Sequence, residues 1–205
     1  MADHDVGKPA ADPAAHAYIE GMIHYAVFET VIGWAGVAWA EQGLVGAHLP
    51  ENDPAIVRAS FARRFPQASE AEPSPPLTSV VEDIRALMRG DKVDLLEAPL
   101  DLARVPAFNA KVYAITRQIP PGQTLTYGEI AVKLGDRLLA QQVGAALGKN
   151  PWPIVVPCHR VTAANGKLGG FSARGGAQTK LKLLAIEGAP AAAQTDLFGQ
   201  SPARD

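Results

Sequence analysis

Residues 150–161 read NPWPIVVPCHRV and contain the single cysteine of the chain, Cys158, directly before His159 and Arg160. A lone cysteine is more often an inert buried residue than a nucleophile. Basic neighbours favour the reactive thiolate, however, and Pro157 fixes the backbone direction just before the thiol. From these residues alone Cys158 is a candidate nucleophile, and the inert alternative stays open.

The sequence around this stretch predicts a mostly helical C-terminal half. Thr126 is a suitable cap for a short helix, and Gly135-Asp136 separates that helix from the next one. Two short helices around a tight glycine turn are typical of a helix-turn-helix. The helices that we expect in this half cover residues 106–119, 127–134, 137–147 and 178–186.

The N-terminal half predicts a small antiparallel sheet with two helices. Short β-like runs are separated by Gly33 and Gly43, which suit hairpin turns. Asp53 and Pro54 are an N-cap and a first helical residue, and Gly90 ends the second helix. We expect strands over 26–32, 34–40 and 44–49, a helix over 53–65, a linker over 66–76 and a helix over 78–88.

These elements predict an α/β fold of the α+β kind, in which the C-terminal domain is winged-helix-like. We expect a disordered arm over 1–17, an N-terminal α/β domain over 18–94, a catalytic domain over 95–188 and a flexible tail over 189–205. The apolar runs are too short to span a bilayer, and no signal peptide is visible. We therefore expect a cytoplasmic protein without a membrane contact.

Charge is unevenly distributed along the chain. Residues 1–94 hold 7 Lys/Arg against 14 Asp/Glu, whereas residues 95–188 hold 11 against 5. This favours a polyanionic partner for the C-terminal half. One cysteine excludes an internal disulfide, and a structural zinc site usually needs several Cys and His ligands. We expect no metal site.

The stretch at Cys158 resembles the active-site signature of the methylated-DNA–protein-cysteine methyltransferases, also called O6-alkylguanine-DNA alkyltransferases. The resemblance covers about residues 95–188 and includes four further segments. They are Thr126-Tyr127-Gly128-Glu129-Ile130, Val143-Gly144-Ala145-Ala146-Leu147, Gly169-Gly170-Phe171-Ser172 and Leu183-Leu184-Ala185-Ile186-Glu187-Gly188. It implies direct repair of DNA without a cofactor, by irreversible transfer of an alkyl group from O6-alkylguanine to Cys158.

The resemblance implies a role for each matching residue. His159 takes the proton of Cys158, through a water molecule, and Glu187 orients His159, which is the logic of a Cys-His-acid triad. Tyr127 hydrogen-bonds the flipped base and helps to protonate it. Ser172 contacts O6, and the carbonyls of Cys158 and Val161 accept from the exocyclic amine of the base.

The same resemblance implies a DNA-binding surface on double-stranded DNA. The second helix of the helix-turn-helix enters the minor groove, and its small residues permit a close approach. Asn150 ties this motif to the active-site turn. Leu147 and Trp152 are expected to form walls of the pocket, and packing in the core is an equal alternative for both. The expected DNA-side and pocket residues are Ala140, Gly144, Ala145, Leu147, Trp152, Arg160, Val161, Phe171 and Ser172.

The sequence departs from the family pattern at two positions. Gln141 stands where many members have an arginine that fills the gap left by the flipped nucleotide, and Arg137, four residues earlier, is a possible substitute. Phe171 stands where some relatives have tyrosine. A lesion-binding protein that does not repair DNA is therefore an alternative, and a cysteine hydrolase is a third.

The tail contains a short motif of its own. Gln194, Leu197 and Phe198 resemble the motif with which bacterial proteins bind the sliding clamp. Two apolar side chains in a polar tail suit a pocket on a partner, although short motifs also arise by chance. We otherwise expect a monomer.

Overall fold

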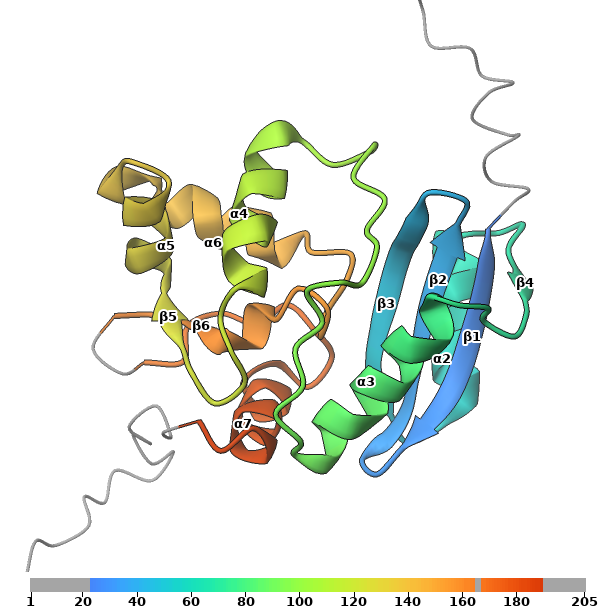
Figure 1. Ribbon diagram of the computed structural model, residues 1–205. Coiled ribbons are helices and arrows are strands. Elements are labelled where there is room, and N and C mark those ends of the chain that lie inside the picture. Colours follow the sequence, from blue (N-terminus) through green and yellow to red (C-terminus); the bar gives the residue numbers. More distant parts are fainter. Residues whose placement is uncertain (1–22, 165–166, 190–205) are drawn as a thin grey trace, which may run out of the picture.

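Three antiparallel strands form the centre of the N-terminal half (Figure 1). The computed structural model describes residues 23–164 and 167–189. The strands are β1 (His24–Thr30), β2 (Gly33–Ala40) and β3 (Gly43–Glu51), which confirms the expected hairpins. Both turns enter the next strand through a glycine with positive φ, 131° at Gly33 and 127° at Gly43, where other residues are strained.

Two helices cover opposite faces of this sheet (Figure 1). They are α2 (Pro54–Arg64) and α3 (Leu77–Arg89). Successive side chains of a strand point to opposite faces. Tyr25 and Val27 accordingly pack with α2, whereas Ala26 and Phe28 join the core on the α3 side.

The ends of both helices follow the sequence signals. The Asp53 carboxylate accepts from the Ala55 N–H at 2.8 Å, and Gly90 ends α3 in the left-handed conformation. The predicted linker over 66–76 contains a two-residue strand, β4 (Ser69–Glu70), which pairs in parallel with β1. The strand order is therefore β3-β2-β1-β4.

The C-terminal half is mostly helical, as expected. Its helices are α4 (Ala107–Arg117), α5 (Tyr127–Lys133), α6 (Ala140–Gly148) and α7 (Gly176–Ile186), with the 3-10 turns η1 (Arg137–Leu139) and η2 (Cys158–Arg160). Short strands β5 (Leu125–Thr126) and β6 (Val161–Thr162) pair in parallel. Helices α5 and α6 form the helix-turn-helix, and a complete capping box between Thr126 and Glu129 begins α5. The expected single helix over 137–147 is instead η1 followed by α6.

Strand β3 connects the two halves. The indole N–H of Trp152 donates to the Leu44 carbonyl at 2.7 Å, and the Ala47 N–H donates to the Pro151 carbonyl at 2.9 Å. One apolar core runs from the α3 side of the sheet into the helical half. The expected domain boundary at 94/95 stays a prediction. The arm over 1–17 and the motif at Gln194, Leu197 and Phe198 lie outside the described residues.

Among the described residues, no helix has the length and apolar character that crossing a membrane would require.

Candidate active site

Cys158 opens a tight turn in which its side chain is partly buried. Pro157 has φ −77° and ψ 66°, which are the angles of an inverse γ-turn, and the Cys158 N–H donates to the Val156 carbonyl at 2.7 Å. The Arg160 N–H donates to the Pro157 carbonyl at 2.9 Å. The proline therefore fixes the direction of the chain at the thiol, as the sequence indicates.

Asn150 stabilises this turn through two hydrogen bonds. Its Nδ2 donates to the Val156 carbonyl at 2.9 Å, and its Oδ1 accepts from the Trp152 N–H at 3.0 Å. Because Asn150 lies two residues after the end of α6, it links the helix-turn-helix to the Cys158 turn. Trp152 is 1% exposed and packs edge-on against Tyr113, so it belongs to the core rather than to a pocket wall.

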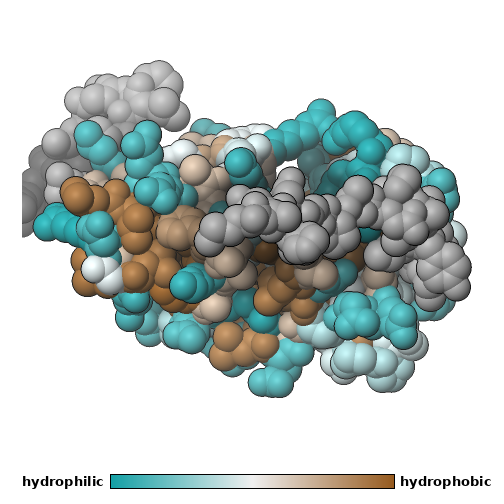
Figure 2. Space-filling view, turned by 90° about the horizontal axis from the view of Figure 1, so that it is seen from above, coloured by the Kyte–Doolittle hydropathy of each residue, from teal (hydrophilic) through white to brown (hydrophobic). Residues whose placement is uncertain are grey.

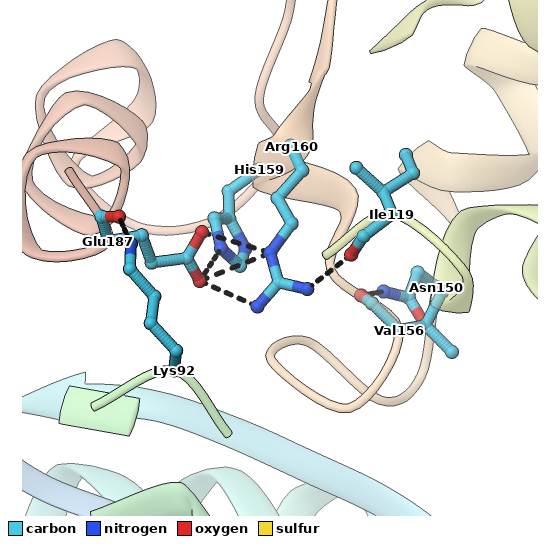
Figure 3. Close-up of polar contacts among 7 residues, drawn as sticks. All are labelled: Lys92, Ile119, Asn150, Val156, His159, Arg160 and Glu187. Carbon is cyan, nitrogen blue, oxygen red and sulfur yellow. Dashed lines mark hydrogen bonds and ion pairs between the residues drawn. The ribbon is translucent and has the colours of Figure 1, made fainter. Parts of the chain in front are cut away.

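His159, Arg160 and Glu187 form a buried polar cluster (Figure 3). His159 Nε2 lies 2.9 Å from Glu187 Oε1. Arg160 donates to both carboxylate oxygens, from Nε at 2.9 Å and from Nη2 at 2.8 Å, and its Nη1 donates to the Ile119 carbonyl at 2.6 Å. The backbone carbonyl of Glu187 accepts from Lys92. Glu187, at the end of α7, is thus fixed rather than solvated.

The cluster also fixes protonation states. Burial alone would raise the pKa of Glu187, but hydrogen bonds from His159 and Arg160 lower it to about 2. Burial lowers the pKa of His159 despite its bond to Glu187, so the imidazole is neutral at pH 7. Since a carboxylate can only accept, Nε2 carries the proton. The remaining lone pair is on Nδ1, which is buried without a hydrogen-bond partner among the described residues.

The surroundings of Cys158 disfavour the ionised form of its thiol. Burial of the sulfur raises the pKa of Cys158, and a hydrogen bond with Asn150 and the charge of Lys180 oppose this effect. A raised pKa means that the thiol needs a base to react at neutral pH. His159, the next residue in the chain, is neutral, and its Nδ1 lone pair has no partner among the described residues.

Lys180 is a site residue that the sequence did not single out. It is fully buried in α7, and Nζ donates to the carbonyls of Val161 at 2.5 Å and Leu168 at 2.6 Å. The ammonium lies 6.0 Å from the ring centres of both Tyr127 and Phe171. Burial lowers its pKa to about 8. A lysine on a predicted helix ordinarily indicates a solvated face, so only the fold reveals this position.

An open cavity of about 550 Å³ leads from Cys158 to the helix-turn-helix. Tyr127 donates to the Gly170 carbonyl at 3.1 Å, and Ser172 donates to the Gly148 carbonyl at 3.3 Å. Gly169 has φ 73°, and a Cβ there would lie 2.9 Å from the Tyr127 ring, so only glycine fits. The lining residues include Tyr127, Ala140, Gln141, Gly144, Leu147, Cys158, Phe171 and Ser172.

One expectation needs correction. The sequence places Arg160 on the DNA side, but it is 4% exposed and holds Glu187, because its guanidinium is the counter-charge of that carboxylate. The Val161 carbonyl accepts from Lys180 and keeps a second lone pair, so its expected bond to the base stays a prediction. Arg137 lies in η1 and does not line the cavity, whereas Gln141 does.

The end of the molecule formed by the helix-turn-helix carries apolar surface. Seen from above, brown residues gather at this end, on the left of the view (Figure 2). Leu138 in η1 is 87% exposed and Val132 in α5 is 59% exposed. Both residues belong to the helix-turn-helix region, in the segment that runs from α5 through η1.

Comparisons with known proteins match this architecture. Residues 107–189 match the family model described as 6-O-methylguanine DNA methyltransferase, DNA binding domain. A methylated-DNA–protein-cysteine methyltransferase of Mycobacterium tuberculosis is 34% identical over 178 residues, which are 86% of this chain and 99% of the relative. A DNA base-flipping protein of Thermus thermophilus is 38% identical over 68% of this chain and 91% of its own length.

Solved structures agree with the sequence relatives. The crystal structure of M. tuberculosis OGT in complex with DNA superposes with a TM-score of 0.65 at 31% identity, over 82% of this chain and 96% of that one. The expected α+β fold is therefore confirmed. With relatives above 30% identity that it covers almost completely, the chain belongs to the methylated-DNA–protein-cysteine methyltransferase family.

Proposed function

We propose that this protein repairs DNA by moving an alkyl group from O6 of guanine to Sγ of Cys158, once per molecule. The observation that carries the proposal is the buried His159-Glu187 pair, which directly follows the partly buried Cys158 in the active-site turn. Glu187 holds the Nε2 proton of His159, so the lone pair of the imidazole is on Nδ1, and the thiol of the neighbouring residue needs a base. This is the division of labour of a nucleophile, a base and an orienting acid.

The transfer is a single displacement at the alkyl carbon. His159 accepts the thiol proton, through a water molecule. The thiolate then attacks the carbon, so that a C–S bond forms as the C–O6 bond breaks and its electron pair stays on the guanine. Tyr127 supplies a proton to the leaving base and is reprotonated from solvent. The thioether is stable, which makes Cys158 a single-use reagent.

The cavity between Cys158 and the helix-turn-helix suits a base that has left the duplex, because the reacting atom is inaccessible in the stack. Ala140 and Gly144 lie on its α6 side and permit a close approach of the DNA backbone. Ser172 supplies a hydroxyl for O6. The Cys158 carbonyl accepts from the Val161 N–H and the Val161 carbonyl accepts from Lys180, and each keeps a second lone pair for the exocyclic amine. The DNA-bound relative supports double-stranded DNA as the partner.

Intact-mass analysis after incubation with O6-methylguanine duplex tests the proposal. Wild type should gain one methyl group, mapped to Cys158, and Cys158→Ala should gain none while still binding the duplex. Binding without a mass gain would instead favour a lesion-binding protein without repair activity. This is the second candidate function, and the Thermus relative named a DNA base-flipping protein supports it. Neither binding nor gain would favour a cysteine hydrolase.

We also propose that the tail binds a bacterial sliding clamp through Gln194, Leu197 and Phe198. A fluorescent peptide of residues 190–205 should bind the clamp, and a peptide with Leu197→Ala and Phe198→Ala should not. Equal binding of both peptides, or none by either, would reject the motif.

A further inference from the structure

Arg64 reaches from the N-terminal half to the active-site loop. It ends α2, and its guanidinium donates to the Ala47 carbonyl at 3.0 Å and to the Pro151 carbonyl at 3.2 Å. The rings of Phe61 and Phe65 lie beneath it, with centres at 5.8 Å and 5.2 Å. Carbonyls and rings thus hold this side chain in one place.

The neighbouring backbone is adapted to the guanidinium. A Cβ on Gly46 would overlap with Nη2 of Arg64, so only glycine leaves the guanidinium where it is. Gly46 is in β3, on the strand that also carries Ala47. The position of the charge is therefore built into the sheet.

This cation has no acidic partner among residues 23–164 and 167–189. None of the ion pairs there includes Arg64, and burial and repulsion from Arg63 lower its pKa. Neutral carbonyls use two of its five N–H donors. A partly buried charge without a counter-ion is costly, and an anion placed beside it is stabilised.

The guanidinium shares a cavity with the nucleophile. A second hollow of about 370 Å³ is lined by both Arg64 and Cys158, together with Lys149, Asn150, Phe171 and Ser172 among others, and no Asp or Glu lines it. It adjoins the larger cavity that faces the helix-turn-helix, because Leu147, Gly148, Cys158, Phe171 and Ser172 line both. A substituent on O6 that extends past the sulfur therefore enters a space with two cations and no acid.

We infer that this hollow receives the far end of long O6 substituents and that Arg64 selects those that end in a carboxylate. The inference rests on the proposed function and deepens it. The reaction is unchanged: the C–S bond forms at the carbon next to O6, the C–O6 bond breaks, and the carboxylate takes no part. It only pairs with Arg64 and thereby holds the carbon near the thiol.

Matched free nucleobases test this selection without DNA phosphates. The probes are O6-(ω-carboxyalkyl)guanines with one to four methylenes, each compared with its neutral ω-carbamoyl counterpart. The readout is the rate of the corresponding mass gain on Cys158. In wild type the carboxylate should react about tenfold faster at the best chain length, the size expected of one charge-assisted hydrogen bond. A ratio of one at every length would overturn the inference.

Three variants assign the preference to Arg64. Arg64→Gln should reduce the rate ratio to about one, whereas Arg63→Gln, at the exposed neighbouring position, should keep it. Gly46→Ala should also reduce the ratio, since it displaces the guanidinium and keeps the charge. Each ratio compares two substrates on the same protein, so a partly misfolded fraction cancels. A preference that survives in Arg64→Gln would contradict the assignment.

A DNA phosphate is the other possible source of an anion. If Arg64→Gln lowers the salt slope of duplex binding by about one and leaves the free-base ratio unchanged, Arg64 binds the DNA backbone and the inference is wrong. Methyl transfer from O6-methylguanine duplex separates the two proposals. Transfer with a ratio of one defeats only the selectivity, whereas the absence of any transfer defeats the proposed function.

Discussion

Oε1 of Glu187 lies 2.9 Å from Nε2 of His159, and the same oxygen accepts from Nη2 of Arg160 at 2.8 Å. All three side chains are less than 5% exposed. One carboxylate therefore orients the His159 imidazole and neutralises a buried guanidinium. Its loss should affect both stability and chemistry.

Glu187→Gln should lower the free energy of unfolding by about 3–5 kcal/mol, because it leaves the Arg160 charge buried without a counter-ion. Denaturant titration followed by circular dichroism measures the change. The control is Glu82→Gln, which breaks an exposed pair with Arg85 and should cost less than about 1 kcal/mol. Equal losses for the two variants would show that the buried pair contributes no more than a surface pair.

Acid should remove the same contribution. The pKa of Glu187 is about 2 in the folded protein against 4.5 for an ordinary glutamate, so its ionised form stabilises the fold fully above pH 4.5. The contribution is lost as the pH falls from 4.5 towards 2, and amounts to about 3 kcal/mol. The difference in unfolding free energy between wild type and Glu187→Gln should shrink over this window. A constant difference would contradict the assigned shift.

His159→Gln should slow methyl transfer at pH 7 by about 100-fold or more, the usual contribution of a general base. Wild type should lose activity only below pH 6.5, because burial lowers the pKa of His159. The variant should recover rate above pH 9, where the thiol ionises without help, since its pKa is raised. Single-turnover rates from pH 5 to 10 measure both limbs, with His24→Gln as an exposed control. A variant with the wild-type pH profile would exclude His159 as the base.

Lys180→Met should raise the pKa of Cys158 further, because the lysine charge favours the thiolate. The chain has one cysteine, so ultraviolet absorbance of the thiolate reports that group directly. Stability should also fall, by about 1–3 kcal/mol for each carbonyl left unpaired. Lys182→Met, an exposed position on the same helix, is the control. An unchanged thiol pKa in Lys180→Met would restrict Lys180 to packing.

Arg137→Ala should weaken binding to O6-methylguanine duplex and slow repair, if Arg137 fills the gap left by the flipped nucleotide in place of the family arginine. Loss of its charge should also lower the salt slope of binding by about one. Gln141→Ala should leave the slope unchanged, because glutamine carries no charge, and should reduce the repair rate through its place at the cavity. Fluorescence anisotropy at several salt concentrations gives the slopes. If Arg137→Ala changes neither affinity nor repair rate, Arg137 does not substitute for the family arginine.

Local signals in the sequence predict the elements well. Asp53 and Thr126 cap their helices as expected, and Gly33, Gly43 and Gly90 mark a turn or an end. These features depend on residues a few positions apart, so they can be predicted from short stretches of the sequence.

Long-range contacts are where sequence reasoning fails. The resemblance places Arg160 on the DNA side, and no local pattern reveals its actual partner, Glu187, which is 27 residues away. Lys180 resembled a solvated lysine because the carbonyls it binds come from two separate loops. The sequence does not indicate a special role for Arg64, because Pro151, whose carbonyl it contacts, is 87 residues further along the chain. In each case a charge is explained only by a partner that the fold supplies.

The hydrogen bond from the Trp152 indole to the Leu44 carbonyl has a practical consequence. A shortened protein that kept only the C-terminal half would lack β3. The Trp152 indole would then be exposed, and its N–H would bind water instead of the Leu44 carbonyl. The loop that leads to Cys158 would also lose its hydrogen bonds to β3. A useful miniature therefore needs a replacement for that strand.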